Sequence, residues 1–465
     1  MPVKLTDEQR DAVVCRNREM LVSAAAGSGK TRVIVERIMS RITGPERRNI
    51  DDFLVITFTN AAAAELRDRF EREISSRISE TPSDRHLKKQ LSLLAKAQIT
   101  TIDAFCLSVV REFNHLCDLS PSVSIVDGAE ADLLRSEALE NTLESLYEEI
   151  ESNTDFAELA SLLSASRDDR LLAGAVSDAY TKIQSHPFPD IWMEETIRVY
   201  ENCPDDFGDT VWGNILLKEA VSTAEAAKRI LETALDLLKD EPSLECKYAP
   251  ALRDDIGVAE GFVSSAGNGW DAAVEAASAP LSRLAAAPRD CDPVLRDRIK
   301  SMREVWKKIY GTISESISEQ SRVHIDEIRR ILPAIRGLFA AVKRYEREYG
   351  RIKSSRNLVD FNDVSHAVIK LLCRRSGELT EPTEVAELIG GRYAEVLIDE
   401  FQDTNGIQTL IADMLTRGRN NLFMVGDVKQ SIYRFRLAEP EIFISRYNTY
   451  KDYSDALGDG VPEIG

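Results

Sequence analysis

The hydrophobic positions near the start of the chain fall into short apolar runs separated by helix-like stretches. Met20–Ala24 and Phe53–Thr57 have the length and composition of buried strands. A segment with helical periodicity follows each run, Gly29–Thr43 after the first and Asn60–Ile74 after the second. Strands that alternate with helices in this way predict a parallel sheet with helices packed against it.

The pattern changes in the middle of the chain and then returns. From about Leu116 to Tyr349 long helical stretches dominate, such as 129–151, 221–239 and 323–349. Strand-like runs reappear at Glu395–Asp399 and Asn421–Val425. The sequence therefore predicts an α/β core of residues 1–115 and 351–445, interrupted by a large all-helical insertion at 116–350 and followed by a tail at 446–465.

The composition narrows the class of protein. With 43% hydrophobic and 29% charged residues among 465, the chain is typical of globular proteins rather than disordered ones. No apolar run reaches the roughly 18 residues that a membrane helix needs, so no membrane association is expected. The seven cysteines are scattered without a metal-binding spacing, which favours reduced thiols and a cytoplasmic location.

The charge of the chain disfavours nucleic acid as a binding partner. The net charge of −19 disfavours long-range attraction to nucleic acid. A local basic groove can still bind phosphates, and six basic residues gather between Lys343 and Arg356. A solvated helix face is the simpler interpretation of this cluster.

Residues Ala24–Thr31 have the pattern of a phosphate-binding loop between a strand and a helix. Small residues let backbone N–H groups surround phosphates, Lys30 would reach the β- and γ-phosphates, and the Thr31 hydroxyl would hold Mg²⁺. Ala24 replaces the usual first glycine, which requires a negative φ at that position. The alternative is a strand–helix turn that binds nothing. The candidate nucleotide-binding residues here are Ala24, Ala25, Ala26, Gly27, Ser28, Gly29, Lys30, Thr31 and Arg32.

An acidic pair supplies the second half of the predicted ATP site. Asp399 and Glu400 follow the apolar run 396–398, at the expected end of a strand. Asp399 could bind Mg²⁺, and Glu400 could orient or deprotonate the attacking water. An acidic pair at a strand end is also common on protein surfaces where it has no function. Its interpretation as part of an ATP site therefore depends on the loop at Lys30.

From Asp399 to Asn405 the chain resembles the UvrD/Rep/RecB class of superfamily 1 helicases. Four further segments resemble motifs of that class in the same order: Leu5–Gln9, Thr57–Ala61, Asp360–Asp363 and Val425–Arg436. The resemblance implies a RecA-like core with ATP and Mg²⁺ as cofactors. It also implies the following roles: adenine contact for Gln9, γ-phosphate sensing for Gln430, and contact with single-stranded DNA for Phe58, Asn60, Tyr433 and Phe435.

Within this class the chain is most similar to the AddA subunits of bacterial helicase–nucleases, in which the position of Ala24 is small but not always glycine. One position departs: Asp103 stands where the class commonly has a histidine facing DNA phosphate, and a carboxylate there would repel phosphate.

The resemblance implies an ATP-dependent 3′–5′ DNA helicase that acts in double-strand break repair and recombination. It also implies a second RecA-like domain, for which no motifs follow Arg436 and which a second chain or a carboxyl-terminal half would supply. A further partner would be a nuclease subunit. Without the second domain we expect very slow hydrolysis, because its arginines stabilise the transition state. A nucleotide-dependent DNA-binding switch or defence-system component without unwinding activity is the alternative.

Overall fold

The computed structural model describes residues 5–25, 27–117, 119, 123–163, 169–377, 379–431, 438–454, 456 and 463–464. The chain divides into two compact units. Unit 1 comprises residues 1–150, 166–192 and 340–465, and unit 2 comprises residues 151–165 and 193–339. The candidate site residues that the structure describes all belong to unit 1.

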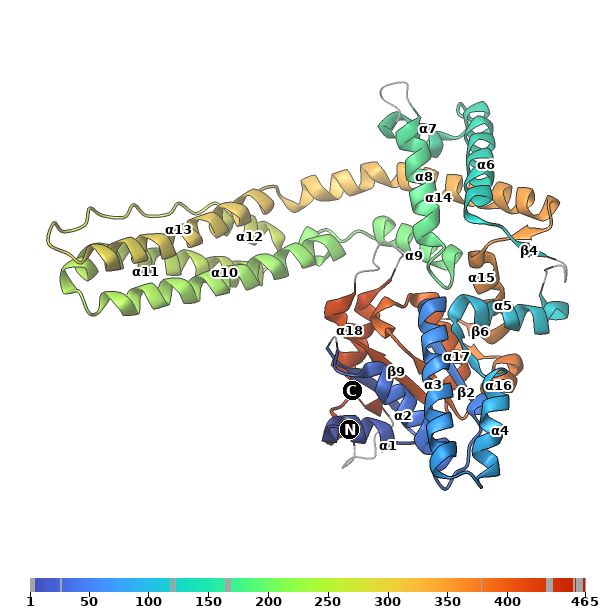
Figure 1. Cartoon of the computed structure of the whole chain (residues 1–465). Helices are drawn as coiled ribbons and strands as arrows, with labels where there is room; N and C mark the ends of the chain where they lie inside the picture. The colour runs from blue at the N-terminus through green and yellow to red at the C-terminus, as the bar shows by residue number, and fades with distance from the viewer. Residues whose placement is uncertain are drawn as a thin grey trace. The chain divides into compact units, whose positions relative to one another are not determined.

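Unit 1 is built on a parallel sheet of six strands in the order β10, β1, β9, β8, β2, β3. Two of these strands, β2 and β9, are labelled in Figure 1. The strands are β1 (Glu19–Ser23), β2 (Phe53–Thr57), β3 (Gln98–Thr101), β8 (Glu395–Ile398), β9 (Leu422–Gly426) and β10 (Glu463–Ile464). Segments from both ends of the chain thus supply neighbouring strands. Because parallel strands end at the same edge of a sheet, the loops after β1, β8 and β9 meet there.

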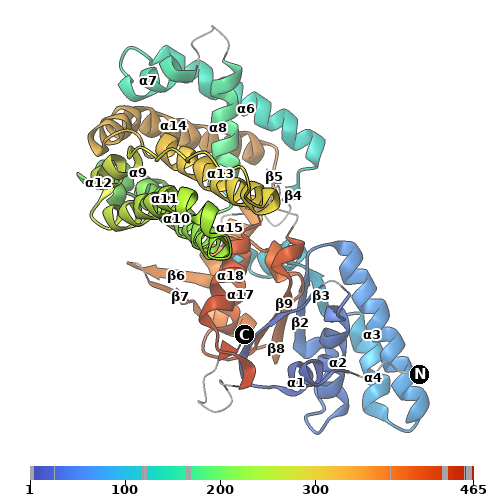
Figure 2. The ribbon, with the colours of Figure 1, turned by 90° about the vertical axis from the view of Figure 1, so that its left-hand side faces the viewer.

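Alternate side chains along the strands enter two separate hydrophobic cores, as the two-residue period of a strand requires. Leu54 and Ile56 pack on one face, and Phe53 and Val55 on the other. Figure 2 shows α3 and α4 on one side of the sheet and α17 on the other. One face is covered by α1 (Asp7–Val14), α2 (Lys30–Thr43), α3 (Asn60–Glu80) and α4 (Arg85–Leu94), and the other by α5 (Ile102–Glu112), α15 (Phe361–Leu372), α16 (Glu384–Gly390), α17 (Gly406–Thr416) and α18 (Pro440–Thr449).

Two small sheets complete the strands of unit 1. β4 (Ser124–Ile125) pairs in parallel with β5 (Leu358–Val359), and β6 (Cys373–Ser376) pairs antiparallel with β7 (Leu379–Pro382). Between β4 and β5 the described elements are helices, of which α6 (Gly128–Glu148) and α8 (Arg170–Ile183) lie in unit 1, while α9 (Pro189–Glu201) and α14 (Ser321–Ser355) run from one unit into the other.

Every regular element among the described residues of unit 2 is a helix, and residues 278–292 form a loop between two of these helices. It contains α7 (Thr154–Leu163), α10 (Val211–Leu238), α11 (Pro242–Ala266), α12 (Trp270–Ala277) and α13 (Pro293–Ser316). Helices α10, α11 and α13 lie side by side (Figure 1) around buried Leu231, Leu252 and Trp306. A buried ion pair at 2.6 Å, between Arg303 and Asp255, crosses this core.

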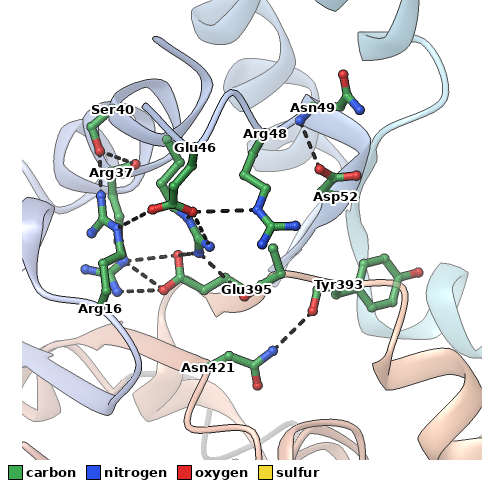
Figure 3. Close-up of polar contacts among 12 residues, drawn as sticks. Arg16, Arg37, Ser40, Glu46, Arg48, Asn49, Asp52, Tyr393, Glu395 and Asn421 are labelled. Carbon is green, nitrogen blue, oxygen red and sulfur yellow. Dashed lines mark hydrogen bonds and ion pairs between the residues drawn. The ribbon is translucent and has the colours of Figure 1, made fainter. Parts of the chain in front are cut away.

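A buried cluster of charges ties helix α2 to strand β8 (Figure 3). Arg37 of α2 is 1% exposed and donates from Nε and Nη2 to the carboxylate of Glu395, the first residue of β8, at 2.6 to 3.1 Å. Arg41 lies 3.5 Å from the same carboxylate. The opposite ends of these elements carry the phosphate-loop pattern and the acidic pair, so the cluster fixes the two halves of the candidate site relative to each other.

The structure confirms the four strands expected from the apolar runs, as β1, β2, β8 and β9. Three helices extend well beyond their expected bounds: α3 continues to Glu80 rather than 74, α14 continues to Ser355 rather than 349, and α10 begins at Val211 rather than at 221. The early start of α10 depends on packing, since the Thr210 side chain accepts from the Gly213 N–H, and a Cβ at Gly213 would lie 1.9 Å from the Phe207 carbonyl oxygen. Gly213 and Asn214 lie in this first turn, and their low helix propensities explain why the sequence alone does not predict a helix there.

Candidate functional site

The loop between β1 and α2 has the backbone conformation that its glycines permit. Gly27 and Gly29 have φ of 73° and 91°, in the left-handed region that disfavours other residues. The Ala24 N–H donates to the Gly426 carbonyl at 3.0 Å. Ala24 is absent from the described residues with positive φ, so the replacement of glycine by alanine carries no strain. Ala26 lies outside the described residues.

Helix α2 begins at Lys30 and presents its first turn to this loop. Gly29 caps the helix without a side-chain hydrogen bond, so the first backbone N–H groups have no side-chain partner there. Such a turn attracts anions. Thr31 and Arg32 follow, both partly exposed.

The acidic pair stands at the carboxyl end of β8, across from this turn. The Asp399 N–H donates to the Ile56 carbonyl, and the Asp399 carboxylate accepts from the Glu400 N–H at 3.0 Å. Glu400 has φ 53° and ψ 46°, a left-handed conformation that costs a non-glycine residue about 1–2 kcal/mol. It is 38% exposed, and its Oε2 lies 2.9 Å from Nζ of Lys30, which is 8% exposed.

A third carboxyl group, that of Asp403, sits beside this pair. Burial, and secondly the charge of Glu400, raises the pKa of Asp399 to about 6, and the same two causes raise the pKa of Asp403 to about 6. Oδ1 of Asp403 is buried without a hydrogen-bond partner. The ammonium group of Lys30 partly offsets these charges, because it lowers the pKa of both Asp399 and Asp403.

The turn after β9 brings further polar groups to the same edge. Asp427 accepts from the Lys429 N–H at 3.0 Å and from Nε2 of Gln430 at 2.5 Å. The hydrogen bond from Gln430 leads the causes that lower the pKa of Asp427. Gln402, which precedes Asp403, donates to Glu400 at 2.8 Å and accepts from the Asp427 N–H at 2.9 Å.

Most of these groups line one cavity of about 560 Å³, at the edge where the strands end. Its lining comprises Thr31, Thr57, Phe58, Thr59, Ala62, Glu65, Leu66, Asp399, Glu400, Gln402, Asp403, Lys429 and Gln430. The structure thus brings together Thr31, the acidic pair, Gln430 and Phe58. Gln402 and Asp403 also line the cavity, but neither is among the site residues expected from the sequence. Their position one residue beyond an acidic pair at a strand end was a signal that could have indicated them.

The cavity residues fit a phosphate chain with Mg²⁺. The loop offers backbone N–H groups, and the Asp403 oxygen without a partner can accept from a metal-bound water. The described residues contain no cluster of three His, Cys, Asp or Glu side chains able to hold a metal. Thr31 and Asp399 would hold Mg²⁺ there, and phosphate oxygens and water would supply its other ligands.

The side chain of Gln9 contacts the loop between β1 and α2 instead of pointing away from the protein. Its Nε2 donates to the Ser28 carbonyl at 2.7 Å, and its Oε1 accepts from the Thr6 N–H at 3.0 Å. Both ends of this amide are engaged, so an adenine contact would have to share or replace one of these bonds.

The residues expected to contact DNA are only partly described. Phe58 is half-buried in the cavity wall, and Asn60 is the exposed first residue of α3. Tyr433 and Phe435 lie outside the described residues. Asp103 lies in the first turn of α5, where burial raises the pKa of its carboxyl group.

The basic residues between Lys343 and Arg356 are largely neutralised. Lys353 is buried against Asp360 and Asp363, at 3.0 and 2.5 Å. Lys343, Arg344, Arg351 and Arg356 pair with Asp190, Glu149, Glu348 and Glu137. This geometry favours the solvated helix face over a DNA-binding groove.

Within the described part of the chain, no helix is long and apolar enough to cross a membrane.

Comparison with known proteins gives one consistent family. Residues 5–451 match the UvrD/REP helicase N-terminal domain. The chain is 38% identical over 461 residues to the ATP-dependent helicase/nuclease AddA subunit of Acetivibrio thermocellus, covering 96% of this chain and 36% of that protein. It is 36% identical over 464 residues to the protein of the same name in Ruminiclostridium cellulolyticum, covering 97% and 37%. The chain spans little more than a third of the length of these curated relatives.

Proposed function

Since the chain belongs to the UvrD/REP helicase family, we propose that it is the ATP-binding motor portion of an AddA-like, ATP-dependent DNA helicase. The observation that carries the proposal is the Lys30–Glu400 contact at 2.9 Å, which joins the phosphate-loop pattern and the acidic pair at one cavity. We infer 3′–5′ movement on single-stranded DNA, a role in double-strand break repair and recombination, and a cytoplasmic location from the same kinship.

The side chains of the cavity divide the work of ATP hydrolysis. The N–H groups of Gly27–Lys30 bind phosphate oxygens, and the Lys30 ammonium leaves Glu400 to neutralise the terminal phosphates. Thr31 and Asp399 hold Mg²⁺, which would withdraw charge from the phosphates. Glu400, released from Lys30, orients or deprotonates the attacking water, and Gln430 senses the γ-phosphate.

The architecture follows the same proposal. The parallel sheet and its helices form a RecA-like core, whose strands come from residues 1–115 and 351–445 and, at β10, from the expected tail at 446–465. Residues 116–350 form an insertion like the 1B subdomain of the family, in which β4 is the one strand among the described residues and the other regular elements are helices. The full machine needs a second RecA-like domain, whose arginines stabilise the transition state and are typically worth on the order of 10³–10⁵ in rate. A partner chain or a further stretch of chain supplies it, and a nuclease subunit joins the complex.

Nucleotide binding by this chain is the first test. Isothermal titration with Mg-ATP should give a Kd that rises roughly ten- to a hundredfold in Lys30→Ala, because a charge-assisted contact is typically worth about 1.5–3 kcal/mol. Lys96→Ala, at an exposed lysine of the same unit, is the matched control and should leave the Kd unchanged. Equal affinity for the wild type and Lys30→Ala would refute the assignment of the loop.

Turnover separates a motor from a switch. We expect near-background hydrolysis by this chain, rising by orders of magnitude with single-stranded DNA when the second domain is supplied in trans. Glu400→Gln should abolish that rise and preserve ATP binding, because the amide fits the same space but is a far weaker base. Nucleotide-dependent DNA binding that never leads to turnover would favour the switch.

A further inference from the structure

Helix α4 carries positive charge in a chain that is acidic as a whole. Residues 85–102 contain four Lys or Arg and no Asp or Glu, although the sequence has 78 acidic residues among 465. Arg85, Lys88 and Lys89 are exposed and lie on the side of α4 opposite buried Leu87. These three side chains therefore form a basic face that is directed toward solvent.

The neighbouring helix α3 shows how such charges are compensated elsewhere in unit 1. There Arg69 pairs with Glu65 at 2.5 Å and Arg77 pairs with Glu73 at 2.8 Å, each pair one helical turn apart. Among the described residues, no carboxylate forms an ion pair with the basic face of α4. Since like charges one turn apart repel, the basic face destabilises the helix that carries it.

The position of the basic face within the helix makes this charge still less favourable. Helix α4 begins at Arg85, so the three cations lie at its amino-terminal end, where the helix dipole is already positive, and its first turn contains no acidic residue. The capping carboxylate of Asp84 accepts from two backbone N–H groups and pairs with Arg47 at 2.7 Å, so its charge is already engaged. Exceptions to local stability rules of this kind are expected at functional surfaces.

The basic face lies at the opposite edge of the sheet from the nucleotide cavity. Just before β2 begins, the Ile50 N–H donates to the Gln90 side chain of α4 at 2.8 Å, and the Asn49 side chain accepts from Lys89 at 3.5 Å. Helix α4 thus packs where the strands start, whereas the cavity lies where they end. The five residues of β2 separate these two edges by roughly 16 Å.

The chemistry of the basic face indicates its partner. Leu91, 37% exposed, is the one large apolar side chain that α4 exposes. Protein–protein interfaces have apolar centres and are depleted in lysine, so an acidic protein surface is a poor match. The basic face has no aromatic side chain on which an unpaired base could stack, which disfavours single-stranded nucleic acid. Duplex DNA, with about one negative charge for every 1.7 Å of its axis, provides the phosphates that such cations bind.

We propose that the basic face of α4 is a docking surface for the phosphate backbone of duplex DNA, separate from the contacts expected of Phe58 and Asn60. The choice of DNA among polyanions rests on the proposed function. The three cations neutralise phosphates and release counterions, which offsets the repulsion present in the free chain. Contacts of this kind carry no sequence information, so duplexes of any sequence bind alike.

Fluorescence anisotropy with a blunt-ended duplex, titrated with the chain at several salt concentrations, tests the proposal. A variant that combines Arg85→Gln, Lys88→Gln and Lys89→Gln should bind at least about tenfold more weakly at low salt. The slope of log K against log salt concentration should fall by about two to three, because each phosphate contact contributes about 0.9. The melting temperature should be unchanged or higher, since the substitutions remove repulsion at the start of the helix.

The matched control removes the same charge from other faces of unit 1. It combines Lys182→Gln, Lys370→Gln and Arg374→Gln, which are exposed residues of α8, α15 and β6. Its duplex affinity should stay within about twofold of the wild type, with an unchanged salt slope, because general charge acts only weakly beyond a Debye length.

The remaining outcomes would overturn the proposal. Unchanged duplex affinity in the α4 variant, or an equal loss in the control, would remove the docking surface, and a lowered melting temperature would give the cations a structural role instead. A larger loss for oligo-dT than for duplex would assign the basic face to single strands. Competition by polyglutamate as strong as by duplex would indicate an acidic protein partner. Mg-ATP binding is measured on the same chains: its absence from the wild type overturns the proposed function, whereas a salt-dependent duplex contact at α4 stands or falls independently.

Discussion

Glu395→Ala tests whether the buried charge cluster holds the two halves of the site together. The substitution removes the carboxylate that Arg37 and Arg41 share and leaves the Arg37 guanidinium buried beneath the sheet. We expect a large loss of stability confined to unit 1, because a buried charge without its partner costs far more than an exposed one.

The magnitude follows from the contacts. The Nε and Nη2 donors of Arg37 lose their acceptors, the carboxylate oxygens that lie 2.6 to 3.1 Å away. Its Nη1 keeps the Ala12 carbonyl, and its guanidinium keeps the Phe423 ring at 4.3 Å. Two lost charge-assisted bonds at about 1.5–3 kcal/mol each agree with the roughly 3–5 kcal/mol typical of a broken buried pair.

Hydrogen exchange followed by mass spectrometry reads the two units separately. Peptides from β8 and α2 should exchange roughly a hundred- to a few thousandfold faster in Glu395→Ala, while peptides from α10 and α11 of unit 2 serve as an internal reference. Glu112→Ala is the matched control, because the Glu112–Arg392 pair in unit 1 has an N–O distance of 2.5 Å but side chains 47% and 41% exposed. It should cost less than about 1 kcal/mol.

A second variant tests the pairing itself. Glu395→Leu combined with Arg37→Met removes both charges and should recover most of the lost protection, because neither partner is left uncompensated. Equal exchange in Glu395→Ala and Glu112→Ala would refute the argument from burial. A double variant as unstable as Glu395→Ala would refute the argument from pairing.

Three further predictions test the cavity and unit 2. Gly29→Ala should weaken Mg-ATP binding in calorimetry and also lower the melting temperature slightly, because alanine at φ 91° is strained and its Cβ would lie 3.3 Å from Nε2 of Gln9. The pKa of Asp403, raised to about 6, makes the folded chain bind more protons than the unfolded chain between roughly pH 4 and 6, so stability falls as the pH rises through that window. Asp403→Asn should therefore slow hydrogen exchange in unit 1 at pH 7, with a difference that vanishes near pH 4. Asp255→Ala, which leaves Arg303 buried and unpaired, should cost about 3–5 kcal/mol in unit 2 and accelerate proteolysis there without changing nucleotide affinity.

The sequence could predict those features of the site that depend on neighbouring residues in the chain. The strand before Ala24, the helix that begins at Lys30, and the acidic pair after β8 are each local patterns, set by backbone sterics and by the alternation of apolar positions. The negative φ required of Ala24 could likewise be predicted, because among the described residues of this loop only Gly27 and Gly29 adopt the left-handed conformation. The resemblance to the helicase family assigned roles to these residues, and those roles remain predictions.

The tertiary structure decided what those residues touch. Lys30 and Glu400 are 370 positions apart, and they meet because β9 alone separates their strands in the sheet. No local pattern marks Gln402 as the amide between two loops, or Lys353 as a buried partner of two aspartates rather than a member of a basic surface. Local periodicity fixes which way a side chain faces, whereas its partner depends on strand order and packing over the whole chain. The sequence by itself therefore determined the elements and the chemistry at their ends, and the fold determined which of those ends act together.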